Sequence, residues 1–178
     1  MQVKLFEARY ANSVAILLNK YLPFEEENEN TVLQAGGIQY ICVANEEVVG
    51  YIAGHLIEEA HNEFPYFEQE LRGLRSLSMD KATFNTSHLV VNPSYRGQGI
   101  GRALVEAYNA AVKEQADAMI VVGWVKSDTN RWEAEKLFTK IDLTRFIYLD
   151  KYFKPYEVYC PSCAGLCYCD ADIYYKAY

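Results

Sequence analysis

The sequence predicts a mixed α/β (α+β) fold, in which helices pack against a sheet with antiparallel strands and a central parallel pair. Short apolar runs alternate with segments whose apolar residues recur at helical spacing. Residues 88–125 read as strand, helix and strand, an order that forms a right-handed unit with parallel strands. Residues 38–57 read as an antiparallel hairpin. Because 178 residues with 51% hydrophobic content suffice for one core, we expect a single domain over 1–178.

Each expected element follows from its local pattern. Branched and aromatic residues alternate or run together in the expected strands, at 2–10, 38–44, 48–57, 82–91, 118–125, 144–150 and 170–178. Apolar residues recur at helical spacing in the expected helices, at 10–22, before Ala35-Gly36-Gly37, at 100–112 and at 134–141. The polar segment 58–80 offers Pro65 as a helix start and Gly73 as a stop, so a short helix is expected there.

The charge pattern narrows the range of partners. The formal net charge is −7, and lysines and arginines are scattered along the chain. This pattern argues against nucleic acid and anionic membranes and agrees with a cationic substrate such as an amine. No apolar run approaches the about 20 residues of a membrane-spanning helix. The N-terminus lacks the basic and apolar segments of a signal peptide, so we expect a cytoplasmic protein.

The stretch from Ser87 to Glu114 places three glycines and an arginine between a strand and a helix. The first backbone amides of a helix have no partner within it, and glycines let an anionic group approach them. The amides of residues 98–101, with Arg96 at the rim, can therefore bind a pyrophosphate. Arg102-Ala103 excludes a nucleotide-hydrolase phosphate loop, and Arg102 replaces the third glycine of a dinucleotide fingerprint. The alternative is a turn that binds nothing.

The longer string "VVNPSYRGQGIGRALVEA" closely resembles the acetyl-CoA signature of the GCN5-related N-acetyltransferase (GNAT) superfamily. Arg96, Gly99 and Gly101 fill its fixed positions after a strand that ends in Val91-Asn92-Pro93. The resemblance covers residues 88–140, and the first 57 residues match the superfamily only in the order of their elements. It implies a mostly antiparallel, splayed sheet with a central parallel pair, and acetyl-CoA as donor.

The resemblance also implies which residues contact the cofactor. The backbone of the strand at Leu89 and Val91 would pair with the pantetheine arm in the gap between two splayed strands. The amides of residues 96–101 would hold the pyrophosphate, and a helix beginning near Asn130 would flank the other side. The expected contacts are Leu89, Val90, Val91, Arg96, Gly97, Gln98, Gly99, Ile100, Gly101, Arg102 and Asn130.

The sequence departs from the family pattern at the positions that move protons. Phe138 stands where a tyrosine often protonates the leaving thiolate, and Asn85 stands where some relatives keep a glutamate. Asn130 lies one residue further from Ala134 than is usual. The candidates near the expected cleft are Glu58, Glu59, Asn85 and His88, with His55 and Asp80 also available. Solvated surface is favoured over catalysis for Glu58 and Glu59, and a packed or capped role is favoured for His88. Residues 59–80 are expected to form the acceptor wall. There Phe64, Tyr66 and Phe67 either line a pocket or belong to a short helix that packs on the sheet.

Four of the five cysteines lie within ten residues, in "CPSCAGLCYC", between the last two expected strands. Thiolates this close can surround a tetrahedral zinc ion, with Cys160, Cys163, Cys167 and Cys169 as ligands and no open position. We therefore rank structural zinc ahead of free or redox-labile thiols, and disulfides last because a cytoplasm is reducing. The loop at 160–169 would pin the last hairpin or offer a partner surface. Cys42 reads as a buried apolar residue.

Two functions fit these features. The first is an acetyl-CoA-dependent N-acetyltransferase, with a small-molecule amine favoured over a protein as acceptor. The second is an acyl-CoA-binding pseudoenzyme or regulatory module whose cysteine knuckle docks a partner, because Phe138 and Asn85 leave both usual proton-transfer positions blank. Positioning and water-mediated proton transfer suffice for a thioester, so we favour the enzyme. A homodimer is compatible with the sequence.

Overall fold

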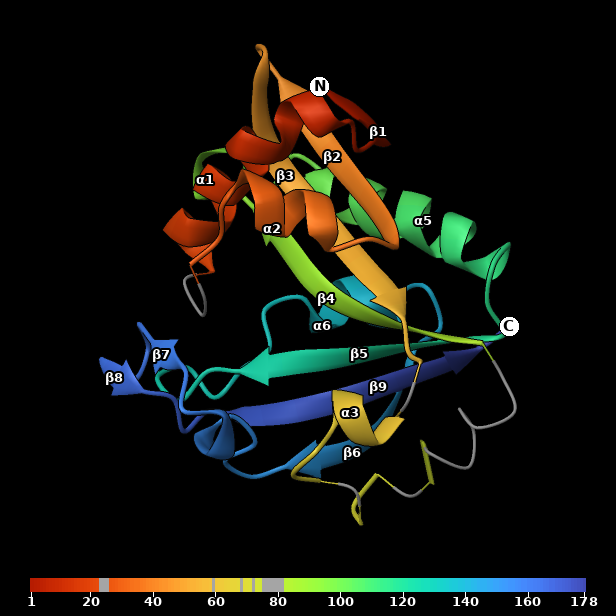
Figure 1. The fold of residues 1–178 in the computed structure, drawn as a ribbon, viewed down its shortest axis with the longest axis vertical. Coiled ribbons are helices and arrows are strands. Elements are labelled where there is room, and N and C mark those ends of the chain that lie inside the picture. Colours follow the sequence, from red (N-terminus) through yellow and green to blue (C-terminus); the bar gives the residue numbers. More distant parts are fainter. Residues whose placement is uncertain (23–25, 59, 68, 72, 75–81) are drawn as a thin grey trace.

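The computed structural model describes residues 1–22, 26–58, 60–67, 69–71, 73–74 and 82–178 (Figure 1). Within these residues a seven-stranded sheet has the order β1-β2-β3-β4-β5-β9-β6, and β7 and β8 form a separate small hairpin. The strands are β1 (Gln2–Leu5), β2 (Ile38–Ala44), β3 (Glu47–Leu56), β4 (Thr83–Val91), β5 (Ala118–Val125), β6 (Thr144–Leu149), β7 (Tyr159–Cys160), β8 (Gly165–Leu166) and β9 (Asp170–Ala177). The helices are α1 (Ala11–Tyr21), α2 (Glu29–Gln34), α3 (Ala60–Glu63), α5 (Ile100–Lys113) and α6 (Glu135–Thr139), with 3-10 turns η1 (Ala8–Tyr10), η2 (Pro93–Tyr95) and η3 (Lys154–Tyr156).

The sheet is antiparallel except at its centre, where β4 and β5 run parallel. These two strands pair only over 83–86 and 118–121, although β4 continues to Val91 and β5 to Val125. Beyond that point they diverge, and Figure 1 shows the gap between their carboxyl ends. The mixed, splayed sheet with one parallel pair confirms the predicted fold class.

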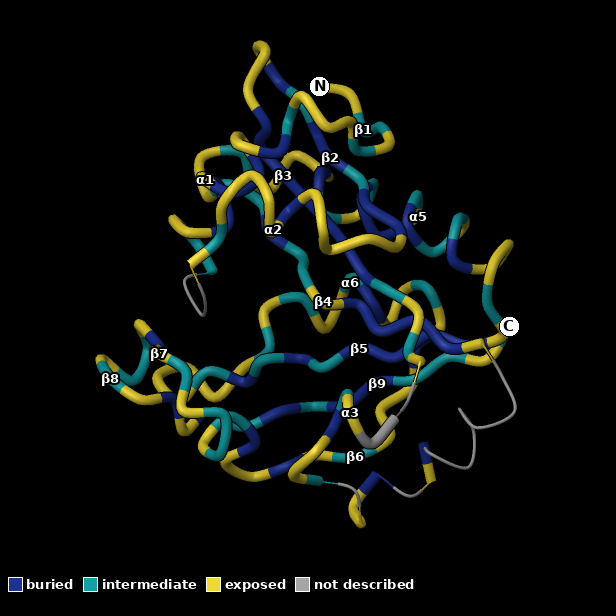
Figure 2. The backbone as a smooth tube through the Cα atoms, in the orientation of Figure 1, coloured by how far each residue is buried: buried dark blue, intermediate teal, exposed yellow. Residues whose placement is uncertain are grey.

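Helices cover both faces of the sheet (Figure 1). On one face, α5 and α6 pack over the centre through Leu104, Tyr108 and Phe138. On the other face, α1 and α2 pack over β2–β4, while the segment around Phe64 and Leu71 packs over β5, β9 and β6. The central strands are consequently buried over most of their length (Figure 2). The two packed regions of this second face form separate clusters, one over β2–β4 and one over β5, β9 and β6.

The observed elements differ from the expected ones mainly in the segment 58–80. The short helix lies at Ala60–Glu63, before Pro65, and Pro65, Tyr66 and residues 69–71 form turns. A proline disfavours helical geometry in the residue before it, so it ends this helix rather than starting one. At the N-terminus, β1 ends at Leu5 and η1 precedes α1. Among the described helices, each is too short or too polar to cross a membrane.

Candidate active site

The turn between β4 and α5 presents a group of backbone amides. Gly97 and Gly99 have φ of 76° and 81°, a conformation that glycine adopts without steric penalty. Gly99 caps α5, and the Ala103 amide donates the first intrahelical bond to the Gly99 carbonyl at 3.0 Å. The amides of residues 100–102 therefore have no acceptor within the helix and form an anion site at its positive end.

The edge of β4 supplies a second set of backbone groups. The Asn92 amide donates to the Val49 carbonyl of β3 at 2.9 Å. Because alternate residues of a strand point their polar backbone groups to opposite edges, Leu89 and Val91 direct theirs toward the gap beside β5. The Arg96 Nε donates to the Val91 carbonyl at 3.3 Å. A bulge at Ser87 marks the start of this edge, since Thr86 opposes Gly54 and His88 opposes Ala53.

These features border a cavity of about 880 Å³ that continues along α6. Eight of the expected cofactor contacts line it: Leu89, Val91, Arg96, Gly97, Gly99, Ile100, Gly101 and Arg102. The other three expected contacts do not line the cavity: Val90, Gln98 and Asn130. Val90 is buried under α1 on the other face, and Asn130 has a φ of 51° and donates its amide to Lys126 at 2.8 Å.

The cavity is basic although the chain is acidic. Five cationic side chains line it: Arg96, Arg102, Arg131, Lys136 and Lys140. Two carboxylates also line it, those of Glu133 and Glu135. Glu133 lies 2.8 Å from the Lys126 Nζ and 3.5 Å from Arg96. The hydrogen bond from Lys126 is the main reason that the pKa of Glu133 falls below its ordinary value, against the opposing effect of burial. Such a lining suits a multiply charged phosphate ligand.

The family model of the acetyltransferase (GNAT) domain matches residues 36–142 of the chain, which include β2–β5, the glycine turn and α6. The chain belongs to this GNAT family. It is therefore an acyltransferase by family, and the glycine turn and cavity described above correspond to the acetyl-CoA signature of the sequence.

Solved structures of similar fold come from acetyltransferases of several kinds. Arabidopsis thaliana NAA60 in complex with acetyl-CoA aligns with a TM-score of 0.70 and 14% identity, covering 99% of this chain and 97% of that one. The ribosomal-protein-alanine N-acetyltransferase of Brucella melitensis gives 0.67 and 13%, covering both chains completely. The aminoglycoside 6'-N-acetyltransferase of Enterococcus faecium gives 0.63 and 15%, covering 99% and 97%. A sequence search of curated proteins finds no match.

Phe138, which the sequence resemblance places where a tyrosine often protonates the leaving thiolate, is buried. Phe138 is 1% exposed and stacks on Trp132 with ring centroids 5.4 Å apart. A phenyl ring in this packed position cannot protonate a thiolate.

The opposite face of the sheet carries a group of polar side chains near the start of the gap. The His55 Nε2 lies 3.1 Å from a carboxylate oxygen of Glu63, and the Asn85 side-chain amide donates to the other oxygen. His55 and Asn85 are cross-strand neighbours on β3 and β4, and Glu63 reaches them from α3. Asn85 is buried, and its Oδ1 has no hydrogen-bond partner among the described residues.

The surroundings shift the pKa values of both His55 and Glu63, which together form the His55–Glu63 dyad. The hydrogen bond with Glu63 raises the pKa of His55, more than partial burial lowers it. Burial pushes the pKa of Glu63 up, but the hydrogen bonds from His55 and Asn85 outweigh burial and hold it below its ordinary value. An oriented imidazole with a raised pKa can accept a proton from an amine.

The other catalytic candidates lie in different settings. His88 lies 4.0 Å from Glu27 on the α1 side of the sheet, and Glu58 is exposed. Glu59 and Asp80 lie outside the described residues. Sequence reasoning missed Glu63, because nothing in its neighbourhood marks it as a partner of His55. The only available signal was a carboxylate in the segment expected to form the acceptor wall.

One cluster in the described residues has the composition of a metal site. The Sγ atoms of Cys160, Cys163, Cys167 and Cys169 all lie within 4.8 Å of one another, in the loop between β6 and β9. This loop contains the β7–β8 hairpin, which the sequence pattern did not predict. Cys42 is buried in the sheet, as expected.

Proposed function

We propose that the protein transfers the acetyl group of acetyl-CoA directly to a primary amine of a small molecule. The observation that carries this proposal is the gap between β4 and β5. On one face the gap opens on the basic cavity at the α5 N-terminus, and on the other face it begins beside the His55–Glu63 dyad. A thioester bound along β4 would meet an amine that approaches from the dyad side.

The proposed steps assign a role to each group. The amides of residues 100–102 and the cationic side chains bind the diphosphate, and the edge of β4 at Leu89 and Val91 pairs with the pantetheine amides. His55, held by Glu63, takes a proton from the ammonium or from the attacking amine, directly or through one water. The neutral amine then attacks the thioester carbonyl and forms the C–N bond. As the tetrahedral intermediate collapses, the C–S bond breaks, the nitrogen gives up its remaining extra proton to water, and water returns a proton to the departing thiolate of CoA. Positioning supplies most of the rate enhancement.

Two observations support a small cationic acceptor. A second cavity, of about 230 Å³, lies between α1, α2 and the sheet and is lined by Glu26, Glu27, Tyr51 and His88 among others. The dyad residues His55 and Glu63 do not line this cavity, but it lies on the same face of the sheet. Its carboxylates favour an ammonium group, and its volume suits a small molecule better than a length of peptide. The free Oδ1 of Asn85 offers an acceptor for an N–H on the same face. We extend the proposal to residues 1–178 as one catalytic domain, because the sheet combines β1, β9 and the strands between them.

The second candidate function is an acyl-CoA-binding module without turnover. The buried Phe138 favours it, because the usual tyrosine hydroxyl is missing there. The module would bind CoA and release no thiol with any amine. The enzyme would release free CoA in proportion to acetylated product.

The test combines binding with turnover. CoA binding is measured by calorimetry, and thiol release from acetyl-CoA is followed with diamines, polyamines, aromatic amines and a peptide with a free N-terminus. We expect CoA to bind and a small amine to outperform the peptide. Binding without turnover on any amine would support the module instead, and preference for the peptide would overturn the small-molecule assignment.

A further inference from the structure

We propose that Cys160, Cys163, Cys167 and Cys169 bind one zinc ion in a closed tetrathiolate site, which fastens the β6–β9 loop to the turn after β5. The cofactor cavity neither contains these cysteines nor requires them for its own amides. The site is therefore additional to the acyltransferase machinery.

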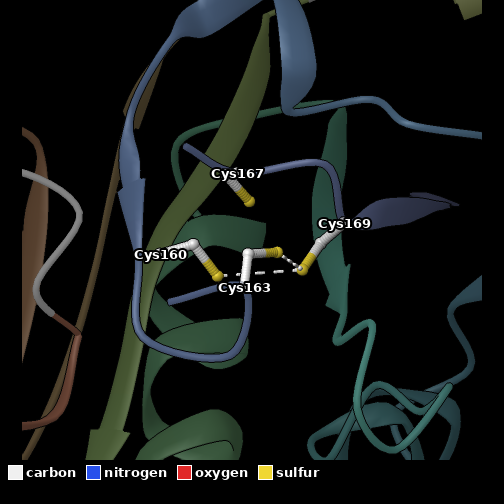
Figure 3. A group of neighbouring side chains, drawn as sticks. All are labelled: Cys160, Cys163, Cys167 and Cys169. Atoms are coloured by element: carbon white, nitrogen blue, oxygen red, sulfur yellow. Dashed lines mark hydrogen bonds between the residues drawn. The ribbon is translucent and has the colours of Figure 1, made fainter. Parts of the chain in front are cut away.

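Two of the sulfur–sulfur distances in the cluster match a tetrahedron around a zinc ion. A zinc–sulfur distance of about 2.3 Å in tetrahedral geometry places neighbouring sulfurs about 3.8 Å apart. The sulfur of Cys169 lies 3.8 Å from that of Cys160 and 3.5 Å from that of Cys163. The four side chains point toward a common centre from separate parts of the loop (Figure 3). All four thiols are free in the structure.

A backbone amide from outside the loop reaches the cluster. The sulfur of Cys169 accepts the amide of Ser127 at 3.3 Å. A backbone N–H donor of this kind stabilises negative charge on a thiolate. Amides that orient ligand atoms in this way are typical of the environment of a metal site.

The setting favours a structural ion over a catalytic one. Cys160, Cys167 and Cys169 are buried and pack with Trp124, Phe153 and Val158, so water has little access. Four thiolates complete the tetrahedral coordination of zinc and leave no position for substrate. Thiolate ligands select zinc over magnesium or calcium, which prefer oxygen.

The ion would act on the fold through Ser127. This residue belongs to the turn between β5 and α6, and its hydroxyl lies 3.4 Å from the Cys163 sulfur in addition to the amide bond to Cys169. The same turn is closed by a bridge between Lys126 and Arg131. Thr129 and Arg131 line the cofactor cavity. A metal-fixed loop would therefore hold one wall of that cavity in place.

The first test measures metal in the full-length protein purified without added metal or chelator. We expect one zinc per chain by plasma mass spectrometry, and stepwise modification of the thiols by a mercurial should release it. Replacement by cobalt should give the intense visible bands of a tetrahedral thiolate complex. Iron at one equivalent would overturn the zinc assignment. Metal-free protein with titratable thiols, or a mass lowered by disulfide formation, would overturn the site itself.

Matched variants localise the ion. Cys163→Ala changes the least buried ligand, and Cys42→Ala changes a cysteine outside the cluster. We expect Cys163→Ala to lose zinc and Cys42→Ala to retain one equivalent. Zinc retained at full stoichiometry and unchanged affinity in Cys163→Ala would contradict the proposal. If Cys163→Ala fails to fold, the mercurial titration of the wild-type protein decides, since release must then track the modification of four thiols.

Discussion

The His55–Glu63 pair shows how a single hydrogen bond can set the chemistry of a residue. Glu63 raises the pKa of His55 above its ordinary value of 6.5, and Asn85 fixes the carboxylate from the far side. A base must be deprotonated to act, so the proposed reaction should lose rate as pH falls through the raised pKa of His55. This dependence of rate on pH arises from two side chains, so substitutions of His55 and Glu63 can test it.

Replacing either member of the dyad should change both rate and pH profile. His55→Gln should lower kcat by about 100-fold or more, the usual contribution of a general base. Glu63→Gln should lower kcat less and move the acidic limb of the profile to lower pH, because the imidazole loses the partner that raises its pKa. Steady-state kinetics across pH measure both effects.

Glu58→Gln is the matched control for this prediction, because Glu58 is exposed near the end of the same strand. Its profile should coincide with that of the wild-type enzyme. An unshifted limb in Glu63→Gln would remove His55 from the proposed role, whatever the loss of rate.

Substitution of Gly99 tests the role of the turn between β4 and α5. Its φ of 81° is left-handed, so Gly99→Ala should cost about 1–2 kcal/mol of unfolding free energy. The same substitution should weaken CoA binding, because the amides of residues 100–102 depend on this turn. Urea unfolding and calorimetry measure the two effects. Gly165→Ala is the control, because an added Cβ meets no atom within 4 Å at either position but Gly165 lacks the left-handed φ of Gly99. Unchanged values in Gly99→Ala would contradict the argument.

At the scale of elements, the β5–α6 turn connects two sites. Ser127 contacts the cysteine cluster, while Thr129 and Arg131 line the cofactor cavity. If the proposed zinc is removed by a chelator, the turn loses its anchor. The Kd for CoA should then rise several-fold, and added zinc should restore it. A Kd that is unchanged in metal-free protein would confine the ion to a purely local role.

The elements also show why some sites could be predicted from sequence and others could not. Arg96, Gly97, Gly99 and Gly101 lie within six consecutive residues, and local backbone chemistry predicts a strand-to-helix turn that can hold an anion there. The four cysteines are likewise local, so their cluster follows from spacing. His55, Glu63 and Asn85 come from β3, α3 and β4. No pattern in the sequence predicts that Glu63 lies beside His55. Proximity created by tertiary packing is visible only in the fold.

Pro65 illustrates a local signal with two opposite meanings. A proline can begin a helix in its first turn or end one by restricting the residue before it. The sequence favoured the first reading, and packing of Phe64 against β5 and β9 favours the second. Whether a proline begins or ends a helix therefore depends on contacts that lie outside the segment.

Across the whole molecule, the two cavities on opposite faces of the sheet differ in the balance of charge of their linings. The cavity on the α5 side is lined by five cationic side chains, whereas the cavity on the α1 side is lined by Glu26 and Glu27. A negatively charged donor and a positively charged acceptor would thus be attracted to different sides of one thin layer. This separation keeps the two ligands from competing for the same surface.

Salt should weaken both interactions. Between about 0.1 M and 1 M salt the screening length falls from about 10 Å to about 3 Å. The Kd for CoA and the KM for a cationic amine should both rise several-fold over this range. Binding isotherms and initial rates measure them, and a neutral amine of similar size provides the control. A KM for the cationic amine as insensitive to salt as that of the neutral one would argue against an acidic acceptor site.

The short pairing of β4 with β5 leaves a seam through the middle of the protein. Four residue pairs join these strands, and beyond them the backbone groups of Leu89 and Val91 face the gap. A bound pantetheine arm would supply the missing rungs, so the donor would also act as a part of the architecture. The amides of Leu89 and Val91 should therefore exchange slowly with deuterium when CoA is bound. They should exchange quickly when CoA has left, because the two halves of the sheet can then open transiently along this gap.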